Sequence, residues 1–396
     1  MNEESVLIRI GEYEGEMVSF TKELVSIPTI NPPGSDYDKV VRLLESRLKM
    51  FGLETKIITC GSYPKKRRSL IARWNNGKER TLHLNAHYDV VPVTSGWTRD
   101  PFRPVTEDGK LFGRGVGDMK AGITMIVYAV KSIMDCGLVP ECNIEMSFTP
   151  DEEIGGEAGV GYLVKNNLIK ADCAIVTEPT RKNTVYFAHK GALWLGVRIK
   201  GRPSHSSRPY MGDNAFVKMA KLVTVLENDA KLLSGKKTRL DCLNEEDSHP
   251  SMVLGGIFSG GSKINTVPDI AEFTIDRRIL PEESIAEVKT GLEKRIRELS
   301  HDVEISVMNV AEPAVSNRQS RIATCLAKSI KELTGEDAKL VMGNGFMDMR
   351  FFVNRRGIPC VAFGIESKNS HGDDEHIKIK DMVECTKILG KAILKY

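Results

Sequence analysis

Residues 81–92 read TLHLNAHYDVVP, and this stretch decides the fold expected for the 396-residue chain. Its apolar half is typical of a buried strand, and two similar runs follow at 143–149 (NIEMSFT) and 171–177 (ADCAIVT). Helical spacing occupies 121–135 and the region near 156–166 between them. Strands that alternate with helices predict an α/β fold with a mostly parallel central sheet flanked by helices. Ligands bind such sheets beyond the carboxyl ends of the strands.

Outward from this core, helical spacing at 14–26 and 36–51 is interrupted by IPTINPPGS. From about residue 190 the order becomes strand, helix, strand, strand, helix, strand, which predicts a compact two-layer, ferredoxin-like unit. A helix at 319–334 and strands near 339–343 and 360–364 then resume the first style. We therefore expect a main domain in two parts, 1–189 and 312–396, with residues 190–311 inserted as a second domain.

Composition excludes several classes of protein. Residues are 41% hydrophobic and 28% charged, and no apolar run approaches the roughly 20 residues that cross a bilayer. A net charge of +3 gives no reason to expect a nucleic-acid partner. The start, MNEESVLIRI, lacks a secretory signal pattern, so a cytoplasmic location is expected. Eight cysteines without a CxxC pair are expected to be reduced core residues, and the run Lys65–Arg68 is expected in a solvated loop without function.

Two polar groups near strand or helix ends are candidates for chemistry. His87 and Asp89 share one face at the end of the first strand, where a carboxylate can orient an imidazole toward a metal. Asp118 follows Gly115 and Gly117 just before a long helix. Taken singly, the first pair is more typical of plain hydrogen-bonded residues, and Asp118 is equally compatible with a helix cap.

Further acidic and imidazole side chains follow the other strands. In TPDEEIGG, Asp151, Glu152 and Glu153 would repel one another unless cations or raised pKa values compensate, although a solvated acidic loop is the alternative. Glu178 follows the third strand, and SHGDDEHIKI offers two more imidazoles near the C-terminus. The predicted sheet places all these groups at one edge. Imidazoles and carboxylates together suit zinc, or cobalt and manganese.

An ordered set of motifs then resembles a known family, the co-catalytic metallopeptidases that include acetylornithine deacetylase, succinyl-diaminopimelate desuccinylase, aminoacylase and carboxypeptidase G. The motifs are HYDVVP, GRGVGDMKAG, TPDEEIGG, TEPT, GRPSHSSRP, INTVPD, DRR and HGDDEH, and they cover nearly the whole chain. The resemblance implies two divalent ions per subunit, zinc in the first place, held by His87, Asp118, Glu153, Glu178 and His371, with Asp118 bridging. It favours His371 over His376 and implies a cis peptide bond between Asp118 and Met119.

The resemblance also implies a reaction. Glu152 would accept a proton from a water bridging the two ions, Asp89 would orient His87, and the hydroxide would attack an amide of a small carboxylate-bearing substrate. Deacylation of an N-acyl amino acid is the expected activity, with a dipeptidase or carboxypeptidase as the alternative and a non-catalytic metal-binding protein as a second one. Asn265 and Arg278 would bind the substrate carboxylate; otherwise Asn265 caps a turn and Arg278 pairs with an acid such as Asp276.

The inserted domain adds two expectations. By resemblance it forms a homodimer, in which His205 of GRPSHSSRP donates a hydrogen bond to the oxyanion in the neighbouring subunit. Without that context a histidine in a turn is typical of a surface residue. Phe346 and Met347 stand where many relatives have small hydroxyl residues, which weakens any direct transfer of acetylornithine or diaminopimelate specificity.

Overall fold

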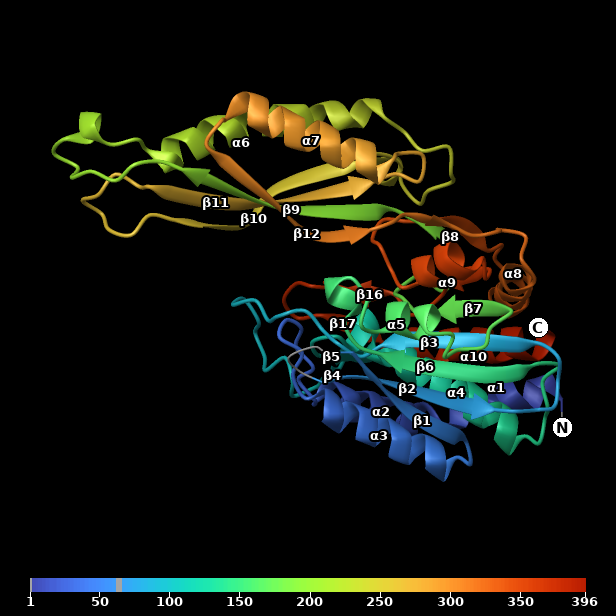
Figure 1. Ribbon diagram of the computed structural model, residues 1–396. Helices are drawn as coiled ribbons and strands as arrows, with labels where there is room; N and C mark the ends of the chain where they lie inside the picture. Colours follow the sequence, from blue (N-terminus) through green and yellow to red (C-terminus); the bar gives the residue numbers. More distant parts are fainter. Residues whose placement is uncertain (1, 62–65) are drawn as a thin grey trace. The chain divides into compact units, whose positions relative to one another are not determined.

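The computed structural model describes residues 2–61 and 66–396, which form two compact units. The first comprises Met1–Phe187, Val315–Val341 and Met347–Tyr396, and the second comprises Ala188–Ala314 and Met342–Phe346. Each unit has a sheet and helices of its own (Figure 1).

The first unit is built on a sheet with the strand order β1-β2-β6-β3-β7-β15-β8-β13, in which β14 also pairs with β8. Its strands are β1 (Glu54–Cys60), β2 (Arg67–Trp74), β3 (Thr81–His87), β6 (Asn143–Thr149), β7 (Cys173–Val176), β8 (Thr184–His189), β13 (Ala314–Val315), β14 (Lys339–Gly343) and β15 (Cys360–Ala362). The four central strands β6, β3, β7 and β15 are parallel, whereas β2 runs antiparallel to β6, and β1 runs antiparallel to β2. The predicted mostly parallel sheet is thus confirmed.

Helices cover this sheet, which explains why its central strands are continuous apolar runs. They are α1 (Glu3–Glu12), α2 (Glu14–Val25), α3 (Tyr37–Met50), α4 (Ala121–Asp135), α5 (Val160–Lys165), α8 (Arg321–Thr334), α9 (Met349–Arg356) and α10 (Ile379–Lys395). Helix α10 packs on α1, α4 and α8, while α9 packs on α5, β7 and β15. Helix α1 was not predicted; Asn2 and Ser5 form a capping box at its start.

A second, small antiparallel sheet joins two distant segments of the same unit. Its order is β16 (Ser367–Lys368), β17 (His376–Lys378), β5 (Lys110–Phe112) and β4 (Val105–Glu107). His376 pairs with Phe112 in this sheet. The loop between β16 and β17 is therefore held beside the segment that follows β5, and each of these two segments carries a predicted metal ligand.

The second unit is a four-stranded antiparallel sheet with two helices on one face (Figure 1). The strand order is β10 (Ser251–Gly260), β11 (Ile270–Ile279), β9 (Gly191–Lys200) and β12 (Val303–Ala311), and the helices are α6 (Ala215–Lys231) and α7 (Ile285–Leu299). Alternate residues of β9 and β11, among them Leu195, Val197 and Phe273, form a core with α6 and α7. This βαββαβ unit has the predicted ferredoxin-like order.

One expectation for the first unit is wrong. Arg67 and Arg68 are not in a solvated loop, because both belong to β2, and the Arg67 side chain is buried against Asp151. Lys65 lies outside the described residues, and Lys66 is exposed. The sequence signal failed because a buried arginine and a solvated one look alike in a basic run.

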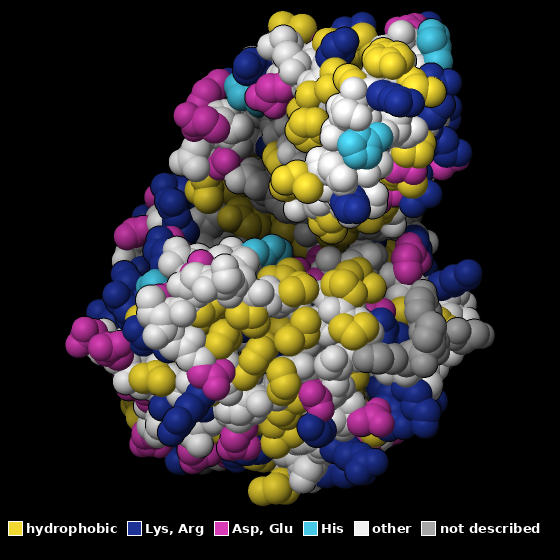
Figure 2. Space-filling view, turned by 90° about the vertical axis from the view of Figure 1, so that its left-hand side faces the viewer, with side chains coloured by type: hydrophobic (Ala, Val, Ile, Leu, Met, Phe, Trp, Pro, Cys, Tyr) yellow, Lys and Arg dark blue, Asp and Glu magenta, His cyan; other side chains and the backbone are white. Residues whose placement is uncertain are grey.

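The remaining expectations from composition concern thiols and surface charge. All eight cysteines are free, and seven of them are buried. Among the described residues, no helix has both the length and the apolarity to cross a membrane. Lysine and arginine side chains are interspersed with acidic ones over the face shown in Figure 2.

Candidate metal centre

Three carboxylates and an imidazole follow the carboxyl ends of adjacent parallel strands. His87 is the last residue of β3 and is buried. Glu152 and Glu153 begin the short 3₁₀ turn η2 (Glu152–Ile154) after β6, and Glu178 comes two residues after β7. Because β3 lies between β6 and β7 in parallel register, these side chains gather at one edge of the sheet.

Asp118 reaches the same place from an irregular turn, η1 (Val116–Lys120), before α4. The peptide bond from Asp118 to Met119 is cis, as predicted. The buried carboxylate of Glu375 accepts the backbone N–H groups of Gly115, Gly117 and Asp118 at 2.8, 3.0 and 3.2 Å. Arg114 Nη1 donates to the same carboxylate at 2.9 Å. Glu375 therefore holds the turn that presents Asp118.

The two oxygens of Asp118 are shared between two imidazoles. Oδ1 lies 3.2 Å from His87 Nε2, and Oδ2 lies 3.2 Å from His371 Nε2. His371 Nε2 is also 3.2 Å from Glu153 Oε2, and His87 Nε2 is 3.7 Å from Glu178 Oε1. The Asp118 carboxylate thus lies between two pairs of side chains. One pair is His87 with Glu178, and the other is His371 with Glu153. His376 instead packs on Phe112 with ring centroids 4.7 Å apart.

The electrostatics of the cluster favour cations. Burial lowers the pKa of His371, but Glu153 and Asp118 outweigh it and raise this pKa to about 11. Burial, and then the charge of Asp118, raise the pKa values of Glu178 and Glu153. Glu153 Oε1 and Glu178 Oε1 are buried and make no hydrogen bond within residues 2–61 and 66–396. Buried carboxylate oxygens without a hydrogen-bond donor need a cation nearby. A divalent ion bound by these oxygens and by the imidazole nitrogens would supply that charge.

Glu152 lies within the same cluster. Ligand atoms of His87, Glu152 and Glu178 lie within 4.8 Å of one another, as do those of His87, Asp118 and Glu153. The Glu152 side chain is buried, and burial followed by the charge of Glu178 raises its pKa well above the ordinary value. A carboxylate with a raised pKa can hold a proton that an ordinary glutamate would release.

Asp89 contacts both the imidazole and the acidic turn. His87 Nδ1 lies 3.1 Å from the Asp89 backbone oxygen and 3.4 Å from its carboxylate. Since the backbone oxygen is closer, it is the better acceptor for the ring N–H. The carboxylate accepts the backbone N–H groups of Glu152 and Glu153, each at 3.3 Å. Asp89 thus connects the ring of His87 to the turn after β6.

The other three predicted site residues belong to the second unit. His205 is exposed, and its Nδ1 accepts the Ser207 backbone N–H at 3.2 Å, which leaves Nε2 to carry the proton in the neutral ring. His205 forms a β-bridge with Thr266, and the Ser206 backbone N–H donates to the Asn265 backbone oxygen at 3.0 Å. The structure therefore places His205 next to Asn265.

Arg278 lies on β11 and has aromatic neighbours. Its Nη2 donates to Asp276 Oδ2 at 2.9 Å, which is the contact expected if Arg278 were structural. Its guanidinium also lies 5.7 Å from the ring centroid of Phe346, which packs edge-on against Trp194 at 5.7 Å. Phe346 is half-buried, and Met347 is buried in the first unit.

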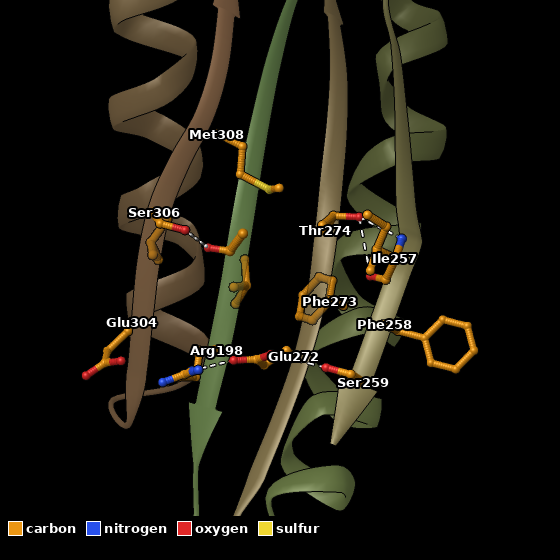
Figure 3. A pocket seen from close by; sticks show the side chains of 13 residues that line it. Arg198, Ile257, Phe258, Ser259, Glu272, Phe273, Thr274, Glu304, Ser306 and Met308 are labelled. Carbon is orange, nitrogen blue, oxygen red and sulfur yellow. Dashed lines mark hydrogen bonds and ion pairs between the residues drawn. The ribbon is translucent and has the colours of Figure 1, made fainter. Parts of the chain in front are cut away.

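The helix-free face of the sheet in the second unit carries a pocket of about 440 Å³ (Figure 3). Ile257, Phe258 and Met308 line it with apolar surface. Its charged groups are already paired, because Glu272 forms an ion pair with Arg198 and Glu304 forms one with Lys200. Among its described lining residues no imidazole stands beside these carboxylates, unlike in the first unit.

Several residues that hold this centre were not assigned a role from the sequence. Asn31, Arg67 and Asp151 form a buried network, and Arg114 and Glu375 brace the Asp118 turn. Asp348 is also buried, and burial raises its pKa to about 7. A Cβ on Gly156 would lie 2.3 Å from Asp348 Oδ1, so this turn needs glycine. The only available signal was the unusual NPPG stretch that contains Asn31.

Comparisons with known proteins place the chain in a family. The model of peptidase family M20/M25/M40 matches residues 83–395. The chain belongs to this family. It is therefore a metal-dependent hydrolase of amide bonds. An uncharacterized metallohydrolase of Methanocaldococcus jannaschii is 27% identical over 94% of this chain and 97% of the relative. A probable succinyl-diaminopimelate desuccinylase of Staphylococcus epidermidis is 28% identical over 93% and 94%.

Among solved structures, this M20/M25/M40 chain is similar to the dipeptidase Dug1p of Saccharomyces cerevisiae. The TM-score is 0.86 at 15% identity, and the match covers 100% of this chain and 98% of Dug1p. At this identity the likeness shows the shared fold alone.

Proposed function

We propose that this chain hydrolyses the amide bond of a small, carboxylate-bearing substrate, and that N-deacylation of an N-acyl amino acid is its activity. The observation that carries the proposal is the sharing of the two Asp118 oxygens between His87 and His371. A carboxylate that faces two ligand groups in this way fits two ions a few ångströms apart. The relatives named desuccinylases support deacylation.

The residues of the first unit divide into two ligand sets. His87, Asp118 and Glu178 would hold one ion, and Asp118, Glu153 and His371 the other. We propose zinc, with cobalt or manganese as substitutes, because the donors are nitrogen and oxygen atoms of borderline softness. Two bound ions would supply a water of lowered pKa and would polarise the scissile carbonyl.

The chain's own groups would handle the proton and the orientation. Glu152 takes the proton of the attacking water on its carboxylate and returns it to the leaving amine, so that an amine and a carboxylate are released. Asp89 keeps His87 in place through its backbone oxygen and its carboxylate. Asn265 and Arg278 would bind the substrate carboxylate, for which Arg278 must exchange part of its contact with Asp276.

We further propose that the protein is a cytoplasmic homodimer assembled through residues 190–311, with 1–189 and 312–396 as the catalytic parts. In this dimer His205 acts in the neighbouring subunit. The tautomer with the proton on Nε2 supports this role, because Nε2–H can donate to an oxyanion while Nδ1 is occupied by Ser207.

We propose a dipeptidase or carboxypeptidase as the second candidate, because the dipeptidase Dug1p shows that this fold also carries peptide hydrolysis. Phe346 bears on this choice, because its aromatic ring lies beside the guanidinium of Arg278. The ring would favour an apolar substituent near the substrate carboxylate. Initial rates of the zinc-loaded protein on N-acetyl and N-succinyl amino acids, against dipeptides with the same C-terminal residues, distinguish the two. Faster hydrolysis of every dipeptide would reject deacylation.

A further inference from the structure

A chain of buried polar contacts connects Arg67 with Asp89 through Asp151 and Asn31, which have no part in the proposed reaction. Arg67 Nε donates to Asp151 Oδ2 at 2.6 Å. Asp151 Oδ1 accepts from Asn31 Nδ2 at 3.0 Å, and the same Nδ2 donates to Asp89 Oδ2 at 2.9 Å. Arg67 is 6% exposed, Asp151 2%, and Asn31 and Asp89 are fully buried. Contacts this deeply buried are shielded from the solvent and salt that weaken surface ion pairs.

The guanidinium of Arg67 is held on several sides. Its two Nη atoms donate to the Pro33 backbone oxygen at 3.3 and 3.2 Å. Its Cζ atom lies over the ring of Tyr37, 5.2 Å from the ring centroid. A Cβ on Gly34 would come within 2.2 Å of Nη1, so the loop before α3 leaves room for the guanidinium only because residue 34 is glycine. A lysine ammonium reproduces the charge of this group but not its planar fork.

Arg67 also balances charge. Asp89 and Asp151 are two buried carboxylates that share one amide group of Asn31. Like charges placed this close destabilise each other unless a cation compensates. Arg67 supplies that cation on the Asp151 side. Removing one partner of a buried ion pair is strongly destabilising, because the other charge is left uncompensated.

The carboxylates of Asp89 and Asp151 both stabilise the turn that carries Glu152 and Glu153. Asp151 begins the turn in the left-handed region at φ 68°, and its side chain is fixed by Arg67, Asn31 and the Tyr37 hydroxyl. Asp89 accepts the two backbone N–H groups that follow, those of Glu152 and Glu153. We propose that Arg67 is a positioning residue, which acts through Asp151 and Asn31 on Asp89 and on the turn that presents Glu152 and Glu153. The proposal rests on the proposed function only for its effect on turnover.

The test compares two neighbouring arginines of β2. Arg68 is the matched control, since its side chain and that of its ion-pair partner Asp38, 3.0 Å away, are only half-buried. Zinc affinity is measured by competition with a chromogenic chelator, and kcat and KM are measured on a substrate of the wild type. For Arg67→Met we expect zinc binding and kcat to fall by about 10- to 100-fold with little change in KM, as for other groups that support metal ligands. Arg67→Lys should lie between Arg67→Met and the wild type, and Arg68→Met should stay within about twofold of the wild type.

A double variant tests the route through Asp151. In Arg67→Met/Asp151→Asn the charge at position 151 is removed together with its partner, and the amide oxygen introduced by Asp151→Asn can still accept from Asn31, so zinc affinity should recover relative to Arg67→Met. If Arg67→Met does not fold, Arg67→Lys and the double variant decide. Zinc affinity of Arg67→Met equal to that of Arg68→Met, or a double variant weaker than Arg67→Met, would overturn the proposal. Because zinc affinity needs no substrate, a wild type without turnover would reject the proposed function and leave this test intact.

Discussion

Replacing Glu152 with glutamine removes one charge and keeps the shape of the side chain. In the structure Glu152 is buried beside Glu178, and its pKa is raised well above that of an exposed glutamate by burial and by that neighbour. A neutral glutamine relieves this repulsion, so the variant should fold at least as stably as the wild type without metal. A loss of turnover can then be assigned to the reaction rather than to unfolding.

The expected loss of kcat follows from the role of Glu152 as the general acid–base group. A positioned general acid–base group contributes about 10²- to 10⁴-fold, which corresponds to about 3 to 5 kcal/mol at 1.36 kcal/mol per decade. We expect kcat of Glu152→Gln to fall by that factor, with KM little changed. Glu157→Gln is the matched control, since Glu157 lies in the same loop with an exposed side chain paired to Arg355. Its kcat should be that of the wild type.

Metal content separates a base from a ligand. Glu152 also lies within 4.8 Å of His87 and Glu178, so the geometry alone would admit it as a ligand. If Glu152 is the base, Glu152→Gln keeps two ions per chain, as counted by elemental analysis after dialysis against zinc. Most of the wild-type kcat retained, or one ion lost, would refute its assignment as the base.

Three further outcomes are expected. First, stability that a histidine gains from a raised pKa is complete below its unfolded value of 6.5 and is lost as pH rises through the folded value, about 11 for His371. Calorimetry should therefore show the Tm of chelator-treated protein falling between about pH 6.5 and about pH 11, and zinc restoring more stability at the higher pH; a gain from zinc that is independent of pH would contradict this. Second, Phe346→Ser should shift the kcat/KM ratio of apolar to polar N-acyl amino acids toward polar ones by about tenfold, and an unchanged ratio would remove Phe346 from the substrate site. Third, mixing inactive His205→Ala and Glu152→Ala chains should restore part of the activity by subunit exchange, whereas no recovery after demonstrated exchange would mean that His205 does not act between subunits.

The fold was readable from the sequence because its signals are local and repeated. Apolar runs at 81–86, 143–149 and 171–177 alternate with helical spacing, and each run is a strand in the structure. The change of pattern near residue 190 also marked a real change of architecture. Helix α1 was not predicted, although Val6 and Ile10 lie four residues apart on one helix face and both are buried.

The centre was only partly predictable, for a physical reason. Acidic and imidazole residues directly after strands must meet once the strands are parallel neighbours, so His87, Glu153 and Glu178 could be grouped in advance. The supports come from elements that are distant in sequence, and nothing local marks them. Arg67 is 84 residues from Asp151, and Glu375 is 261 residues from Arg114. These ion pairs form only when the folded chain brings the distant segments together and buries them. The sequence by itself therefore does not mark them.

The most direct test of the central claim is turnover by the zinc-loaded chain on a panel of N-acetyl and N-succinyl amino acids, with the released amine quantified. The structure predicts release of one free amine for each carboxylate formed. It also predicts that this turnover disappears when zinc is removed by a chelator and returns when zinc is added back. A chain that binds two zinc ions but releases no amine from these substrates or from dipeptides would contradict the claim that this centre hydrolyses amide bonds in small carboxylates.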